Sequence, residues 1–220
     1  MIKANHNKYA RAIISIYLNR ILKKDFSHFF IVNEVTDINP DKALLVTPNH
    51  ISWWDGFFID YINRLYFKRY FYIMMLEEQL KQYPYFSKVG AYSINPESRK
   101  DIIESLEYTA ELLSNPNNIV VMYPQGILEP SGKYPVTIKK GVKFVSEISR
   151  VPFSIIPFAC KISFYNQRKP EVYSRFSRLF SSTALTESFS QYKKVFIDNI
   201  KKVDQASLER NYRKDLFKWK

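Results

Sequence analysis

The feature that most constrains the fold is an alternation of strand-like and helix-like segments between residues 40 and 180. Short continuous apolar runs alternate with segments whose apolar residues recur every three or four positions. This pattern predicts an α/β fold, in which a single domain holds a mixed, largely parallel sheet flanked by helices. The expected strands cover 42–47, 71–75, 91–94, 119–123, 151–162 and 172–176, and the expected helices cover 51–65, 77–82, 95–113 and 139–148.

Both ends of the chain differ from this central region. Residues 8–24 have the pattern of an amphipathic helix with five Lys and Arg residues around its apolar positions. Two interpretations stay open, because such a helix can lie in a membrane interface or pack on the domain core. We expect three regions: an N-terminal amphipathic, membrane-associating segment at 1–30, the α/β domain at 31–185, and a helical tail at 186–220.

The charge balance narrows the possible partners. The chain has 33 Lys and Arg against 21 Asp and Glu, a net charge of +12. Such a balance suits nucleic acid, an anionic membrane or an anionic substrate. The basic residues are spread along the chain without a nucleic-acid-binding motif, so we expect no nucleic acid partner and favour a membrane surface. No run of about 18 apolar residues is present, and we expect neither a signal peptide nor a membrane-crossing helix.

His50 is the histidine with the best support for chemistry. It directly follows an expected strand, and α/β folds place reactive groups at strand ends. Asp55 follows five residues later, about 140° around a regular helix, so the two side chains meet only if His50 lies in the entry turn and Asp55 in the first helical turn. Asp55 then orients one imidazole nitrogen and leaves the other as a base. Taken alone, the pair is still more often structural. His6 and His28 have no comparable support, and we expect structural roles for them.

Further motifs follow in order along the chain. The segment Asn49-His50-Ile51-Ser52-Trp53-Trp54-Asp55 matches Asn-His-x-Ser-x-x-Asp, the first motif of the glycerophospholipid acyltransferase family, at every position. Tyr123-Pro124-Gln125-Gly126-Ile127-Leu128-Glu129 stands where the third motif has Phe-Pro-Glu-Gly-Thr-Arg-Ser. Residues 90–99 and 151–157 are similar to the second and fourth motifs. Over about residues 40–180 the chain therefore resembles this family, which includes the lysophosphatidic acid acyltransferases.

The resemblance implies a reaction. The protein is expected to be an O-acyltransferase in which His50, oriented by Asp55, takes the proton of an acceptor hydroxyl that attacks the thioester of acyl-CoA or acyl-carrier protein. The acceptor is a lysophospholipid or a related lipid or glycolipid, and neither a cofactor nor a metal is required. The expected location is the cytoplasmic face of a membrane, peripheral or monotopic. The expected substrate-binding residues are Asn49, Ser52, Arg99, Tyr123, Pro124, Gln125 and Gly126.

Departures from the third motif change which acceptor we expect. Gln125 replaces the acid, while Ile127 and Leu128 replace Thr and Arg, which favours a less charged or bulkier acceptor than a glycerol phosphate. The same changes leave open a non-catalytic lipid-binding relative of this fold, although the intact His50–Asp55 pair argues against it. Lys139 and Lys140 suit either the donor's phosphates or a solvated face. Adjacent Trp53 and Trp54 cannot face the same way, so one can line an acyl groove or interface while the other packs.

Overall fold

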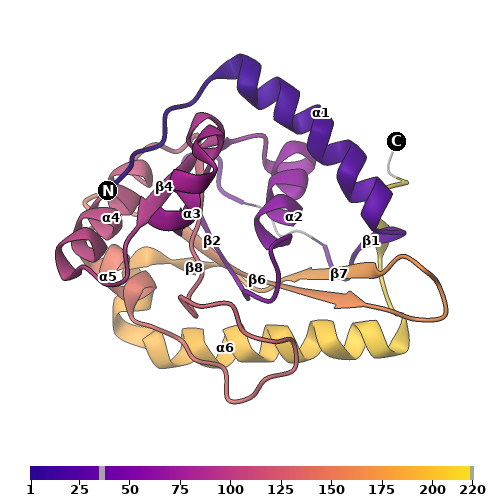
Figure 1. Ribbon diagram of the computed structural model, residues 1–220. Coiled ribbons are helices and arrows are strands. Elements are labelled where there is room, and N and C mark those ends of the chain that lie inside the picture. The colour runs from indigo at the N-terminus through magenta and orange to yellow at the C-terminus, as the bar shows by residue number, and fades with distance from the viewer. Residues whose placement is uncertain (35–37, 219–220) are drawn as a thin grey trace.

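The computed structural model describes residues 1–34 and 38–218 and confirms the expected α/β fold. Nine strands form one sheet in the order β4-β3-β5-β2-β6-β7-β1-β9, with β8 paired to β6. Figure 1 shows α6 along one side of this sheet and α1 and α2 on the other. The strands are β1 (His28–Ile31), β2 (Leu44–Pro48), β3 (Tyr70–Leu76), β4 (Ala91–Ile94), β5 (Asn118–Val121), β6 (Ser154–Ser163), β7 (Glu171–Phe176), β8 (Phe180–Ser181) and β9 (Lys214–Asp215). The helices are α1 (Lys8–Asp25), α2 (Asp55–Ile62), α3 (Glu77–Gln82), α4 (Arg99–Leu112), α5 (Gly141–Ile148) and α6 (Ser182–Glu209), with a π-helix η1 at Asn63–Phe67 and a 3-10 helix η2 at Pro84–Val89.

Five neighbouring strands run in the same direction. β4, β3, β5, β2 and β6 pair in parallel, and β2 lies between β5 and β6. The pairing of Leu44 with Ile119 and with Ser154 sets the register of this central region. Because parallel strands end at one edge of a sheet, the loops after β2, β4 and β5 come together there. This edge therefore brings the expected first, second and third motif segments together.

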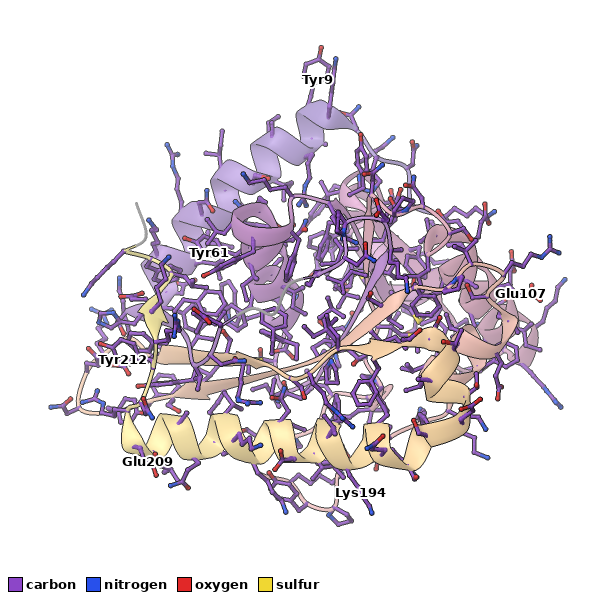
Figure 2. The ribbon with its side chains drawn as sticks, turned by 180° about the vertical axis from the view of Figure 1, so that it is seen from behind. Tyr9, Tyr61, Glu107, Lys194, Glu209 and Tyr212 are labelled. Atoms are coloured by element: carbon purple, nitrogen blue, oxygen red, sulfur yellow. The ribbon has the colours of Figure 1, made fainter. Side chains whose placement is uncertain are left out.

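Alternate residues of the central strands pack on opposite faces of the sheet. Leu45, Val120 and Ile155 belong to a core shared with α4, α5 and α6. Their chain neighbours Leu44 and Ile119 face a second core, shared with α1 and α2. Both faces of a mainly parallel sheet must be covered in this way, which explains why these strands are continuously apolar. Side chains fill the layers above and below the sheet, as Figure 2 shows from behind.

Helix α1 packs on the domain core, and its place in a membrane interface stays a prediction. Asn7 caps it by accepting hydrogen bonds from the main-chain nitrogens of residues 9 and 10. Leu18 and Leu22 are buried against the domain, and each such side chain contributes roughly 1.5–3 kcal/mol when fully buried. Other apolar side chains of the same helix remain exposed: Tyr9, Ile13, Ile16 and Tyr17. No helix in the described part of the chain is both long enough and apolar enough to cross a bilayer.

Several element boundaries differ from the expectations. α4 begins at Arg99 and is capped by Ser98, whose hydroxyl accepts from the nitrogen of Asp101, so the helix expected over 95–113 starts four residues later than predicted. The expected helix over 51–65 starts only at Asp55, because residues 51–54 form the turn that Asp55 closes. The domain boundaries expected at residues 30/31 and 185/186 stay predictions, and β1 and α6 each run across one of them. Strands β1, β8 and β9 were not predicted from the sequence.

Candidate active site

His50 and Asp55 meet in the way that their five-residue spacing requires. β2 ends at Pro48, so His50 lies in the loop behind it, and Asp55 is the first residue of α2. Nδ1 of His50 lies 3.0 Å from Oδ2 of Asp55. This hydrogen bond fixes the plane of the imidazole and leaves Nε2 as the nitrogen that can exchange a proton with another molecule.

The carboxylate of Asp55 is fully buried but well supplied with donors. Its Oδ2 accepts from the main-chain nitrogens of Ile51 (2.8 Å) and Ser52 (3.0 Å), and Oδ1 accepts from the Ser52 hydroxyl (2.6 Å). The thiol of Cys160 adds a further donor, with Sγ 3.6 Å from Oδ1. Burial and then the charge of Asp55 raise the pKa of this thiol well above its usual range, so the sulfur keeps its proton. A buried carboxylate is tolerated only when it is hydrogen-bonded in this way.

The ring of Tyr123 packs against one face of the His50 imidazole. Its ring stacks on His50 with the ring centroids 4.0 Å apart and the planes 24° from parallel. Burial raises the pKa of the Tyr123 hydroxyl well above 10, so the ring is a neutral phenol. The imidazole is therefore fixed by Asp55 at one edge and by an aromatic ring on one face.

His50 forms part of the wall of a mostly apolar cavity of about 720 Å³. Three exposed cations also line this cavity: Arg99 at the start of α4, Lys140 as the N-cap residue of α5, and Lys139 before it. Helix N-termini attract anions, so this rim suits a phosphate. The apolar side chains of the wall come from α1, β3, β4, α4 and α5 and include Ile14, Leu18, Ile73, Met74, Ile94, Ile102, Leu106 and Phe144.

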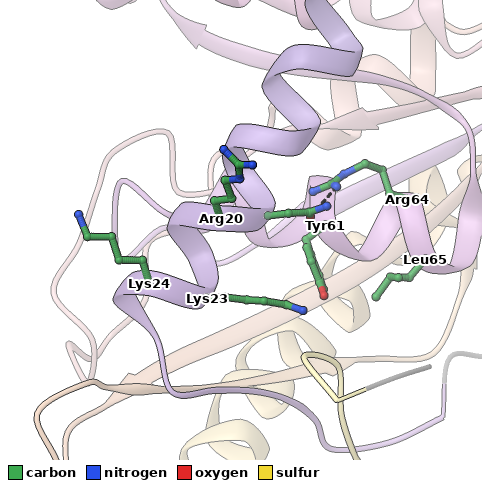
Figure 3. A pocket seen from close by; sticks show the side chains of 7 residues that line it. Arg20, Lys23, Lys24, Tyr61, Arg64 and Leu65 are labelled. Atoms are coloured by element: carbon green, nitrogen blue, oxygen red, sulfur yellow. Dashed lines mark hydrogen bonds between the residues drawn. The ribbon is translucent and has the colours of Figure 1, made fainter.

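A second hollow, of about 500 Å³, lies between α1 and the end of α2 and η1. Arg20, Lys23, Lys24 and Arg64 line it, but Figure 3 shows Lys24 pointing away from Arg64. Arg64 is already held, because its Nε donates to Asp60 (3.1 Å) and its Nη1 to Asn19 (2.7 Å). Among the residues that the structure describes, neither a histidine nor a carboxylate lines this hollow. It therefore lacks the groups that the predicted chemistry needs, whereas the cavity of about 720 Å³ contains His50.

A protein-family model described as Acyltransferase matches residues 29–161, which is more than half of the chain and includes the loops after β2 and β5. The chain belongs to the acyltransferase family. It is therefore an enzyme that transfers acyl groups. The fold is similar to the crystal structure of the 1-acyl-sn-glycerophosphate (LPA) acyltransferase PlsC from Thermotoga maritima, with a TM-score of 0.62 and 17% identity over 94% of this chain and 84% of that chain. No significant match was found among curated proteins.

The cavity of this acyltransferase contains only part of the predicted site. His50, Arg99, Tyr123, Pro124 and Gly126 line it. Gly126 has a φ of +67°, which favours glycine, and a β-carbon at this position would come within 2.9 Å of the Lys139 side chain. The tight turn at Gly126 thus allows Lys139 to approach the cavity rim. Trp53 also lines the cavity, whereas Trp54 packs edge-to-face on Phe26.

Three predicted substrate-binding residues instead bond within the acyltransferase, away from the cavity lining. Asn49 pairs with the main chain of Cys160. Ser52 donates to Asp55, and Gln125 is buried and accepts from the main-chain nitrogen of His50 at 2.7 Å. These contacts support the position of the His50–Asp55 pair rather than contact with a substrate.

The sequence did not reveal two further contributors to the acyltransferase site. The first is Cys160, whose thiol reaches Asp55. Its sequence signal was its place in an apolar strand, which is common to most buried cysteines. Glu129 was noted only as part of a divergent third motif, yet it is buried beside Gln125. Charged residues in loops are usually exposed, so the sequence does not predict that Glu129 is buried.

Proposed function

We propose that this acyltransferase moves a fatty acyl group from a thioester onto a hydroxyl of a lysophospholipid or a related lipid, with His50 as general base. The observation that carries this proposal is the 3.0 Å hydrogen bond between His50 Nδ1 and Asp55 Oδ2 in the wall of a large apolar cavity. Histidine is the side chain that most often serves as a general base, and the hydrogen bond to Asp55 orients it for that role. The cavity supplies a place for an acyl chain away from water.

The proposed reaction needs no residue as a covalent nucleophile. Nε2 of His50 takes the proton of the acceptor hydroxyl as its oxygen attacks the thioester carbonyl. The tetrahedral intermediate then collapses, the carbon–sulfur bond breaks, and the departing thiolate receives the proton from the imidazolium. Asp55 keeps the imidazole in the right tautomer and stabilises its positive form. The products are an ester and a free thiol.

The charged rim supports an anionic group on at least one substrate. Arg99, Lys139 and Lys140 offer cations at the starts of two helices, and guanidinium and ammonium groups bind phosphate well. A lysophospholipid headgroup and the phosphates of acyl-CoA or acyl-carrier protein share this chemistry. Ile127 and Leu128 are also exposed in the cavity lining, which suits an acceptor with additional apolar surface.

A membrane surface is the proposed source of the acceptor. Tyr9, Ile13, Ile16 and Tyr17 recur at helical spacing on the exposed side of α1, while Ile14 and Leu18 of the same helix line the cavity. Basic residues near the end of the helix suit an anionic lipid surface. We place the enzyme peripherally on the cytoplasmic face, where thioester donors are available, with α1 in the lipid interface.

The test compares acyl transfer by the wild type and by His50→Ala, using acyl-CoAs and acyl-carrier protein as donors and a total lipid extract as acceptor. Removal of a general base should lower the rate by roughly 10²–10⁴-fold. His28→Ala is a matched control, because His28 also pairs with a carboxylate, with Nδ1 2.8 Å from Asp215 Oδ2, but lies outside the cavity lining. The control should keep its activity. Undiminished transfer by His50→Ala would overturn the proposal.

A further inference from the structure

A closed ring of hydrogen bonds surrounds the main chain of His50. The nitrogen of His50 donates to Oε1 of Gln125 at 2.7 Å, and Nε2 of Gln125 donates to Oε2 of Glu129, also at 2.7 Å. The main-chain nitrogen of Glu129 then donates to the carbonyl oxygen of His50 at 2.9 Å. Both main-chain groups of the proposed base are therefore tied to the loop that follows β5.

The chemistry of the partners fixes the direction of every bond in this ring. A main-chain N–H can only donate and an ionised carboxylate can only accept, so the Gln125 amide must present its oxygen to His50 and its nitrogen to Glu129. Gln125 and Glu129 are 3% and 2% exposed, respectively. Lys133 supplies the counter-charge, with Nζ 2.7 Å from Oε1 of Glu129. First the Lys133 bond and then the Gln125 bond lower the pKa of Glu129 below its usual value.

The carboxylate of Glu129 lies at a different position from the acid of the family's third motif. The third motif, Phe-Pro-Glu-Gly-Thr-Arg-Ser, has its acid at the position of Gln125 and serine at the position of Glu129. In this chain one of the two positions again carries a carboxylate, but it is position 129 and not position 125. A glutamate at position 125 would face the carboxylate of Glu129 where the structure has a donor.

We propose that Glu129 is a positioning residue for the acyl transfer, acting through Gln125 to hold the main chain of His50 in its reactive place. This inference rests on the proposed role of His50. Neither Gln125 nor Glu129 lines the cavity. Their loss should therefore change kcat and leave KM nearly unaltered.

The test exchanges the amide and the carboxylate between positions 125 and 129. Gln125→Glu places two buried carboxylates together, breaks the ring and should lower kcat roughly 10–100-fold, because small displacements of a reacting group are costly. Glu129→Gln keeps an amide oxygen that can accept from Gln125, so it should lower kcat by less than Gln125→Glu does. The double variant Gln125→Glu/Glu129→Gln rebuilds the ring with only the bond between the two side chains reversed, so that residue 129 donates and residue 125 accepts. It should recover to within about threefold of the wild type, since neighbouring residues are strongly coupled.

The pH profile separates positioning from general damage. In Gln125→Glu one of the two facing carboxylates keeps its proton to a higher pH, because like charges at one site raise a pKa. The protonated group can donate, so the kcat of this variant relative to the wild type should rise as pH falls. Glu147→Gln is the matched control, since it removes a Lys–Glu pair of the same spacing at the surface of α5 and should leave kcat unchanged.

The outcomes distinguish the two proposals. Undiminished activity in His50→Ala would overturn the proposed function and this inference with it. If His50→Ala loses activity as expected while Gln125→Glu matches the wild type, or while the folded double variant is no better than Gln125→Glu, only the positioning role of Glu129 fails. Thermal unfolding of each variant confirms that it is folded before its rate is compared.

Discussion

The side-chain amide of Asn49 bonds to both main-chain groups of Cys160, with Oδ1 2.8 Å from its nitrogen and Nδ2 2.9 Å from its carbonyl oxygen. These bonds extend the pairing of β2 with β6 beyond its last pair, Pro48 and Phe158. The chain is thus held on β6 one residue before His50, at the same cysteine whose thiol contacts Asp55.

Replacement of Asn49 by Ala should destabilise the protein. Each buried main-chain group left without a partner costs about 1–3 kcal/mol. The free energy of unfolding in urea measures the loss. Asn117 is exposed in the loop before β5, and Asn117→Ala should change this free energy by less than about 0.5 kcal/mol. Equal effects of the two substitutions would contradict the role of the Asn49 bonds.

Asp55→Asn should lower kcat by roughly 10²–10⁴-fold, because an amide orients the imidazole poorly and cannot stabilise its charged form. The amide nitrogen would also face the donors from Ile51 and Ser52 that now meet a carboxylate oxygen. Steady-state kinetics with the acceptor found for the wild type checks this. A variant that keeps more than half of the wild-type kcat would show that Asp55 does not orient the base.

Ile13→Asp together with Ile16→Asp should weaken binding to vesicles that contain anionic lipid by at least about tenfold, since each isoleucine contributes up to roughly 1.5–3 kcal/mol when fully buried. Both side chains are more than half exposed, so the fold should tolerate the change. Vesicle co-sedimentation measures the binding. Leu208→Asp is the control, because Leu208 is exposed on α6, which covers the other face of the sheet.

Arg99→Ala distinguishes a phosphate-bearing acceptor from a neutral one. With a lysophospholipid the variant should show a KM raised by about tenfold, because a charge-assisted hydrogen bond is worth roughly 1.5–3 kcal/mol. With a neutral glycolipid acceptor the KM should stay unchanged. An unchanged KM for both acceptors, and for the donor, would remove Arg99 from the binding site.

His6 should make stability depend on pH. Its ring packs edge-on against Tyr72, and burial followed by the charge of Arg11 lowers its pKa below 6.5. His6 therefore stays neutral in the folded protein where the unfolded chain already takes up a proton, so stability is full above pH 6.5 and declines as pH falls toward the lowered pKa. His6→Phe should reduce the difference in unfolding free energy between about pH 7.5 and about pH 5.5. An identical decline in both proteins would show that other groups cause it.

Local contacts were predictable from the sequence, and distant ones were not. The meeting of His50 with Asp55 follows from the turn geometry over five residues, and the alternating pattern was enough for the parallel sheet. Strand β9 has only the polar residues Lys214 and Asp215, and it exists because β1 offers it an edge. The contact between His50 and Gln125 spans 75 residues and depends on the register of β2 and β5, which no local pattern specifies.

The place of β2 has a consequence for the motions of the site. This strand is fully buried and hydrogen-bonded on both sides, to β5 and to β6, so its amides can exchange with solvent hydrogen only when the centre of the sheet separates. His50 lies two residues beyond the end of β2. The proposed base is thus attached to the part of the sheet that we expect to open last.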